Sequence, residues 1–165
     1  MSEKNISESD YLKKTLDQIK QLNRKESGLE LTSAYLDSLM PEELMEEEKN
    51  RIRAGIVDIV YTTPKMATNS DILYLMGQSL DKVVEMLVVD EAHLISDWGL
   101  SFYPEYRRID NIRQHLLDIN PNLKTLLLSA TVTKKTKNDI LERVYHNEST
   151  DIIDSNKTRN DITLN

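Results

Sequence analysis

The sequence predicts an α/β domain built on a mostly parallel sheet. Two apolar runs, Met86–Val89 and Lys124–Leu128, indicate strands buried inside such a sheet, because strands covered on both faces read as continuous hydrophobic stretches. Segments with apolar residues at helical spacing lie between the expected strands. At 165 residues the chain is long enough for one core, and a second domain is not expected.

The first third of the chain predicts a tail, a helix, a strand and a second helix. Residues 1–10 are polar and predict a loose tail. A helix is expected from Tyr11 to about Gly28, because apolar residues recur at helical spacing, at Leu12, Leu16, Ile19 and Leu22. Leu29–Leu36 indicates a short strand. Pro41 suits the first position of the next helix and Gly55 its end, and the charged residues between them predict a solvated face without chemistry.

The later elements alternate in the same way. Ile56–Thr62 predicts a strand, Asp71–Met76 a short helix, and Leu80–Lys82 the approach to the strand at Met86–Val89. A further helix is expected over residues 106–116, ended by Asn120 and Pro121. After the strand at residues 124–128, Thr133 is expected to cap a helix with Ile140, Leu141 and Val144 facing the core, and Asp151–Ile153 to form a last short strand.

Two acidic residues directly follow the apolar run Met86–Val89. In open parallel sheets ligands bind at the carboxyl ends of the strands, which is where Asp90 and Glu91 are expected. One carboxylate there can hold Mg²⁺ through water and its neighbour can polarise an attacking water, so the pair suits hydrolysis of a nucleoside triphosphate. The alternative is that the pair only caps the next helix.

The residues around this pair resemble a known family. Asp90-Glu91-Ala92-His93 is similar to the DEAH box of superfamily 2 helicases, and the continuation Ile95–Gly99 with Phe102, Pro104 and Tyr106 resembles the aromatic-rich loop of the RecQ family. Four further segments match RecQ-type enzymes in the right order: Ala34–Leu36, Arg51–Gly55, Tyr61–Pro64 and Ser129–Thr131. The resemblance covers the chain from about Leu12 to Asn165.

The resemblance implies a fold and a division of the chain. It predicts a RecA-like P-loop NTPase fold of three layers with a mostly parallel sheet, truncated at its N-terminal strands. Residues 1–10 would be a flexible tail, 11–155 a partial ATP-binding domain 1, and 156–165 a linker toward an absent second RecA-like domain.

The resemblance also implies ATP and Mg²⁺ as cofactors and assigns roles around them. Asp90 would hold Mg²⁺ through water, and Glu91 would orient or deprotonate the attacking water. Coupling of the nucleotide site to strand movement would involve four residues: His93, Trp98, Ser129 and Thr131. From the residues alone, His93 is a structural hydrogen bonder and Ser129 to Thr131 an ordinary turn between strand and helix.

A second group of residues is expected to contact single-stranded or partly duplex DNA. By resemblance Thr62, Thr63 and Pro64 touch the strand backbone; the local alternative is that Pro64 ends a strand and Thr62 caps the next segment. Aromatic side chains beside arginines can stack on unpaired bases while guanidinium groups meet phosphates, which predicts contacts from Trp98, Phe102 and Arg107. The alternative for Trp98 is a core anchor.

The sequence departs from the RecQ pattern at several points. Leu100 and Tyr103 stand where RecQ proteins usually carry His and Arg, which leaves open a superfamily 2 translocase outside RecQ. The four glycines are followed by Leu29, Ile56, Gln78 and Leu100, so no phosphate-binding Gly-Lys-Ser/Thr loop is present. The chain alone is therefore expected to bind ATP poorly and to hydrolyse almost none.

The absent segments also predict a partner. Without the phosphate-loop strand, residues 124–128 would have an open apolar edge, and such edges pair with other chains. The expected partners are missing helicase segments or a complementing chain, together with DNA.

Composition excludes several classes of protein. The chain has no cysteine, so disulfides and thiolate metal sites are excluded. No apolar run approaches the roughly 20 residues of a membrane helix, and no membrane is expected as a partner. The net charge of −7 argues against a uniformly basic surface, but six basic residues cluster near the proposed functional segments: Arg107, Arg108, Arg113, Lys134, Lys135 and Lys137.

The preferred hypothesis is part of a RecQ-type ATP-dependent DNA helicase that moves 3′ to 5′ on a single strand and unwinds duplexes in DNA repair and recombination. A cytoplasmic location is expected, nucleoid-associated in a bacterium, and a nuclear one in a eukaryote. The alternatives are a non-catalytic remnant that binds nucleic acid or a partner, and the non-RecQ translocase.

Overall fold

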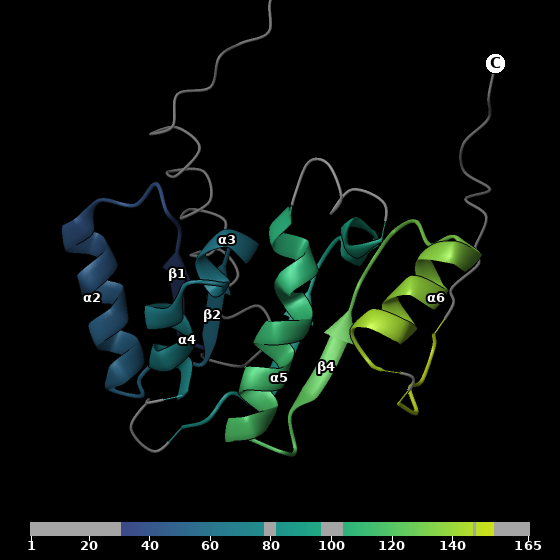
Figure 1. Ribbon diagram of the computed structural model, residues 1–165. Coiled ribbons are helices and arrows are strands. Elements are labelled where there is room, and N and C mark those ends of the chain that lie inside the picture. The colour runs from purple at the N-terminus through teal and green to yellow at the C-terminus, as the bar shows by residue number, and fades with distance from the viewer. Residues whose placement is uncertain (1–30, 78–81, 97–103, 147, 154–165) are drawn as a thin grey trace, which may run out of the picture.

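The computed structural model describes residues 31–77, 82–96, 104–146 and 148–153. Helices and strands alternate along these residues, as the sequence predicts (Figure 1). The strands are β1 (Ser33–Leu36), β2 (Ile59–Thr62), β3 (Met86–Val89) and β4 (Lys124–Leu127). The helices are α2 (Glu42–Arg53), α3 (Pro64–Ala67), α4 (Ser70–Gly77), α5 (Ile109–Ile119) and α6 (Lys134–Arg143), with short 3₁₀ helices η1 (Ala92–Ile95) and η2 (Pro104–Arg108). The predicted tail, first helix and linker lie outside the described residues.

The four strands form two parallel pairs. β1 pairs with β2 in a register that places Leu36 opposite Thr62. β3 pairs with β4 so that Val88 lies opposite Leu126 and Val89 opposite Leu127. The expectation of an α/β fold with parallel strands is confirmed, and the parallel arrangement brings the carboxyl ends of β3 and β4 to one edge.

The helices pack on the two sheets and form two cores, and of these helices α2 joins β1 to β2 and α5 joins β3 to β4. Ile52 of α2 and Ile72 and Leu75 of α4 pack with β1. α5 contributes Ile109, Ile112 and Leu116, which pack with Val89 of β3 and with Val144 just after α6. Crossovers between parallel strands are right-handed, so each helix covers one face of the pair that it joins.

The prediction that β3 and β4 are buried on both faces is wrong. Met86 and Val88 are each 50% exposed, and Leu126 and Leu128 are each 44% exposed. These alternate residues share the face opposite α5, and no element within the described residues covers that face. An apolar run shows that both faces can be buried, but only tertiary packing decides whether they are.

Several element boundaries also differ from the expectation. α2 begins at Glu42, with Pro41 as its N-cap. α3 was not predicted, and its cap is Thr63 rather than Thr62, because the Thr63 hydroxyl accepts a hydrogen bond from the backbone N of Met66 at 3.3 Å. Residues 151–153 form no strand, since they pair with no described strand and Ile153 is 94% exposed. Among the helices in the described ranges, none is long and apolar enough to span a membrane.

Candidate active site

Asp90 and Glu91 lie at the carboxyl edge of the β3–β4 pair. The backbone N of Leu128 donates to the Val89 carbonyl at 2.9 Å, and the backbone N of Ala92 donates to the Leu128 carbonyl at 2.8 Å. The ladder therefore continues past both strands and holds the acidic pair beside the turn that begins at Ser129. Both acidic residues are exposed. Glu91 is the N-cap residue of η1, but its side chain makes no capping hydrogen bond to that helix.

Glu91 occupies a backbone conformation that is uncommon for residues other than glycine. Its φ of 50° and ψ of 41° lie in the left-handed region, which costs an L-residue about 1–2 kcal/mol. The backbone N of Glu91 donates to Oδ1 of Asp90 at 2.8 Å, which supports this turn. Backbone strain of this kind concentrates at functional sites. Here it turns the chain sharply from β3 into η1.

His93 links Glu91 to the turn after β4. Its Nδ1 lies 3.2 Å from Oε2 of Glu91 and 3.1 Å from Oγ of Ser129. The Ser129 hydroxyl donates to the Thr131 carbonyl at 3.0 Å and accepts, at 3.4 Å, from the backbone N of Thr131. With its own hydrogen donated to Thr131, the Ser129 hydroxyl can accept a hydrogen bond from His93 in the tautomer that carries a proton on Nδ1.

The donor set fits a magnesium ion bound together with a phosphate. Mg²⁺ is commonly held by one or two carboxylates, with waters and substrate phosphates completing its shell. Asp90 uses Oδ1 for the bond to Glu91, and its Oδ2 makes no hydrogen bond to any residue that the structure describes. In the described ranges no three acidic or histidine side chains gather in a way that could hold a metal.

The predicted DNA-contacting residues are not all brought to this edge of the β3–β4 pair. Thr62 ends β2, and Thr63 and Pro64 come directly after it, so these three lie at the carboxyl end of the β1–β2 sheet instead. Trp98 and Phe102 lie outside the described residues, as do Leu100 and Tyr103.

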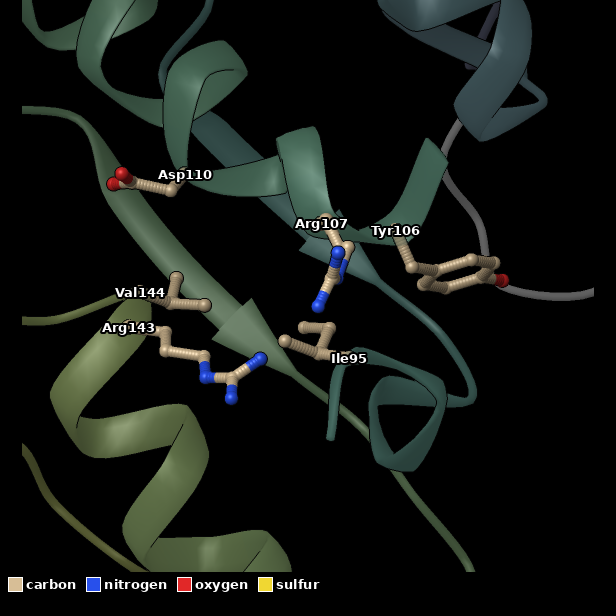
Figure 2. Close-up of a pocket in the computed structure, with 6 residues that line it drawn as sticks. All are labelled: Ile95, Tyr106, Arg107, Asp110, Arg143 and Val144. Atoms are coloured by element: carbon tan, nitrogen blue, oxygen red, sulfur yellow. The ribbon is translucent and has the colours of Figure 1, made fainter. Parts of the chain in front are cut away.

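Arg107 belongs to η2 and lines a cavity whose volume is about 440 Å³. The other lining residues are Ile95, Tyr106, Asp110, Arg143 and Val144 (Figure 2). Arg143 was not singled out by the sequence, because an arginine near a helix end reads as an ordinary dipole partner.

Arg113 does not belong to the exposed basic cluster in which the sequence placed it. It is 5% exposed, and its guanidinium donates to the Val144 carbonyl at 3.1 Å and to Oε2 of Glu148 at 2.5 Å. It also lies 5.3 Å from the centre of the Tyr145 ring. Its position on the inward stripe of α5 makes it a structural residue that ties the end of α6 to the core.

Comparison with known proteins identifies relatives of the chain. Residues 11–140 match the family model described as DEAD/DEAH box helicase. The chain is 31% identical over 121 residues to the ATP-dependent DNA helicase RecQ of Bacillus subtilis (strain 168), a match that covers 73% of this chain and 19% of the relative. It is 30% identical over 145 residues to the ATP-dependent DNA helicase Q-like SIM of Arabidopsis thaliana, covering 83% of this chain and 16% of that protein. The chain thus spans less than a fifth of the length of these relatives.

Proposed function

The chain belongs to the DEAD/DEAH box helicase family, and we propose from that premise that it is part of a RecQ-like ATP-dependent DNA helicase. The whole enzyme would hydrolyse ATP while moving along single-stranded DNA and separating a duplex. The similarity to two proteins named DNA helicases supports this substrate, and the 3′ to 5′ direction comes from the RecQ resemblance.

In this proposal Asp90 and Glu91 carry the hydrolytic chemistry. Asp90 would hold Mg²⁺ through water, and the ion would supply neutralisation of the triphosphate charge. Glu91 orients a water and takes its proton as the oxygen attacks the γ-phosphorus, while the bond to the bridging oxygen breaks and ADP leaves. The exposed positions of both carboxylates, at the sheet edge where ligands bind, support these roles.

The observation that carries the proposal is the position of His93 between the Asp90-Glu91 pair and the segment Ser129–Thr131. Its Nδ1 lies 3.2 Å from Oε2 of Glu91 and 3.1 Å from Oγ of Ser129. A change in the charge or position of Glu91 therefore alters, through His93, the hydrogen bonds of Ser129 and Thr131. Thr131 is followed closely by Thr133, whose hydroxyl caps α6 by accepting from the backbone N of Thr136 at 3.1 Å. Hydrolysis at Glu91 is thereby linked to α6.

We also propose that another segment supplies the phosphate-binding loop, either in the same polypeptide or in a complementing chain. These 165 residues contain no Gly-Lys-Ser/Thr loop. The uncovered face of β3 and β4 presents Val88 opposite Leu126, flanked by Met86 and Leu128, which is the surface that such a segment could cover. Contacts to DNA are assigned to Thr62, Thr63, Pro64 and Arg107, and by resemblance to Trp98 and Phe102.

A chimera tests the proposal. The matching region of the Bacillus subtilis helicase is replaced by residues 31–153 of this chain, so that the relative supplies the phosphate loop and the remaining domains. The chimera should hydrolyse ATP, and single-stranded DNA should stimulate it. This chain alone should hydrolyse almost none.

Paired glutamine substitutions then test the catalytic role in the chimera. Glu91→Gln removes the proton acceptor and should lower hydrolysis by roughly 10²–10⁴-fold while leaving DNA binding intact. Glu85→Gln is the matched control, because Glu85 is also exposed and lies at the opposite end of β3. Equal activities of the two variants would show that Glu91 is not the base.

A second candidate is a non-catalytic remnant that binds nucleic acid or a partner, and the half-exposed apolar side chains of Met86, Val88, Leu126 and Leu128 favour a binding surface. A remnant predicts a folded chimera that binds single-stranded DNA and hydrolyses no ATP. Hydrolysis by the chimera at a rate near that of the Bacillus subtilis enzyme contradicts it.

A further inference from the structure

The cavity between η1, η2, α5 and α6 presents two arginines to one space. Figure 2 shows Arg107 from η2 and Arg143 from the end of α6 both extending toward the space beside Ile95, Arg107 from above and Arg143 from the left in this view. Both are exposed, and neither guanidinium forms a hydrogen bond or ion pair with any residue in the described ranges. Arg113, by contrast, is buried and fully engaged with its neighbours.

The remaining lining residues favour an anion in this space. Asp110 is the only acid among the residues that line the cavity. Its Oδ1 lies 2.9 Å from Nε2 of His146, so its carboxylate is hydrogen-bonded to a residue outside the cavity lining. Ile95 and Val144 are 2% and 1% exposed and form an apolar floor. Low polarity beside a charge strengthens its hydrogen bonds to an oppositely charged ligand.

The chemistry of the two side chains selects the ligand. A guanidinium presents parallel N–H groups that match two oxygens of a phosphate, and two guanidiniums from opposite sides can hold one phosphate between them. We propose that this cavity is a subsite that clamps one backbone phosphate of a nucleic-acid single strand between Arg107 and Arg143. The inference rests on the proposed function, which supplies the strand, and it adds Arg143 and the clamp.

The location connects this subsite to the hydrolytic pair. Ile95 ends η1, the element that begins directly after Glu91. The hydroxyl of Ser96 donates to Asp139, which ties the end of η1 to α6, and α6 carries Arg143. A phosphate that draws Arg107 and Arg143 together therefore acts on η2 and on α6, and α6 is the helix to which the end of η1 is bonded through Ser96.

Strand binding by the full chain tests the clamp. Affinity for a fluorescent oligothymidylate is measured by anisotropy at several salt concentrations for Arg107→Ala, Arg143→Ala and Arg143→Lys. Arg108→Ala is the matched control, because Arg108 is the exposed neighbour of Arg107 and does not line the cavity. Circular dichroism verifies that each variant is folded.

Each alanine variant should bind about tenfold more weakly, and the slope of log affinity against log salt should fall by about 0.7 for each phosphate that the variant no longer neutralises. Arg143→Lys should give an intermediate affinity, because it keeps the charge and loses the fork. Arg108→Ala should lose markedly less affinity and keep the slope.

The outcomes separate this inference from the proposed function. If the wild-type chain binds the strand and Arg143→Ala matches Arg108→Ala in affinity and slope, the clamp is wrong and the helicase proposal stands. If calorimetry detects Arg143-dependent binding of inorganic phosphate while the strand does not bind, the cavity is a free-anion site and the clamp is wrong. If Arg143→Ala weakens strand binding but the chimera hydrolyses no ATP, the clamp stands and the proposed function fails.

Discussion

Replacing Glu91 by glycine should stabilise the fold at the expense of the proposed chemistry. At φ 50° and ψ 41° an L-residue is strained by about 1–2 kcal/mol, and glycine avoids almost all of this strain. Glycine adds about 0.5–1 kcal/mol of backbone entropy to the unfolded chain, which leaves a net gain of about 0.5–1 kcal/mol. Glu91→Ala keeps the strained backbone and, like the glycine variant, has no carboxylate near His93, so it is the reference.

The comparison is made by urea unfolding followed by circular dichroism. Glu91→Gly should be more stable than Glu91→Ala by about 1 kcal/mol, which corresponds to a difference of about 2–4 °C in Tm for a domain of this size. Gly55→Ala calibrates the scale, because Gly55 has a φ of 68° and a Cβ there should cost about 1 kcal/mol or more.

One result would refute this reasoning. If Gly55→Ala loses stability as expected and Glu91→Gly is no more stable than Glu91→Ala, the left-handed turn at Glu91 does not store strain. The activity of the Glu91→Gly chimera should be as low as that of Glu91→Gln in either case, because both lack the carboxylate.

Three further predictions concern other parts of the fold. Arg113→Met removes a buried guanidinium bonded to the Val144 carbonyl and should lower the free energy of unfolding in urea by about 3 kcal/mol. Glu148→Gln, at the exposed end of the Arg113–Glu148 ion pair, should lower it by under about 1 kcal/mol. Equal losses in the two variants would contradict a structural role for Arg113. A hydrogen bond from Lys82 lowers the pKa of Asp58 from 3.8 to about 2. The stability that this pair adds to the fold is therefore fully present above pH 4 and is lost as the pH falls through 2. After discounting for solvent it is about 1 kcal/mol, and Asp58→Asn should show a smaller loss of stability between pH 4 and 2 than the wild type. In the chimera, Ser129→Ala should leave basal hydrolysis largely intact and reduce its stimulation by DNA. Adding His93→Ala should reduce the stimulation little further, because both substitutions break the same His93–Ser129 contact. Additive losses in the double variant would show that the two residues act separately.

The sequence located the candidate site because the signals there are local. An apolar run followed by two acids predicts a parallel strand that ends in carboxylates, and β3 with Asp90 and Glu91 has this arrangement. The place of Thr133 as a helix cap was likewise readable, because a hydroxyl three residues before a backbone N–H satisfies it within one turn.

Other features depend on segments that are distant in sequence. The Arg107–Arg143 cavity joins residues 36 positions apart, and nothing in either local segment marks the pairing. Arg113 reads as part of a basic cluster, but α5 turns it inward, where carbonyl and carboxylate oxygens from beyond α6 surround it.

The sequence by itself determined the alternation of most of the strands and helices, the parallel character of the strands, and the delivery of Asp90 and Glu91 to a sheet edge, because periodicity and caps act within a few residues. Only the tertiary structure decided which face of β3 and β4 is covered, where Arg113 points, and that His93 stands between Glu91 and Ser129. Burial and convergence of side chains depend on which elements pack together, and that choice is made by contacts across the whole chain.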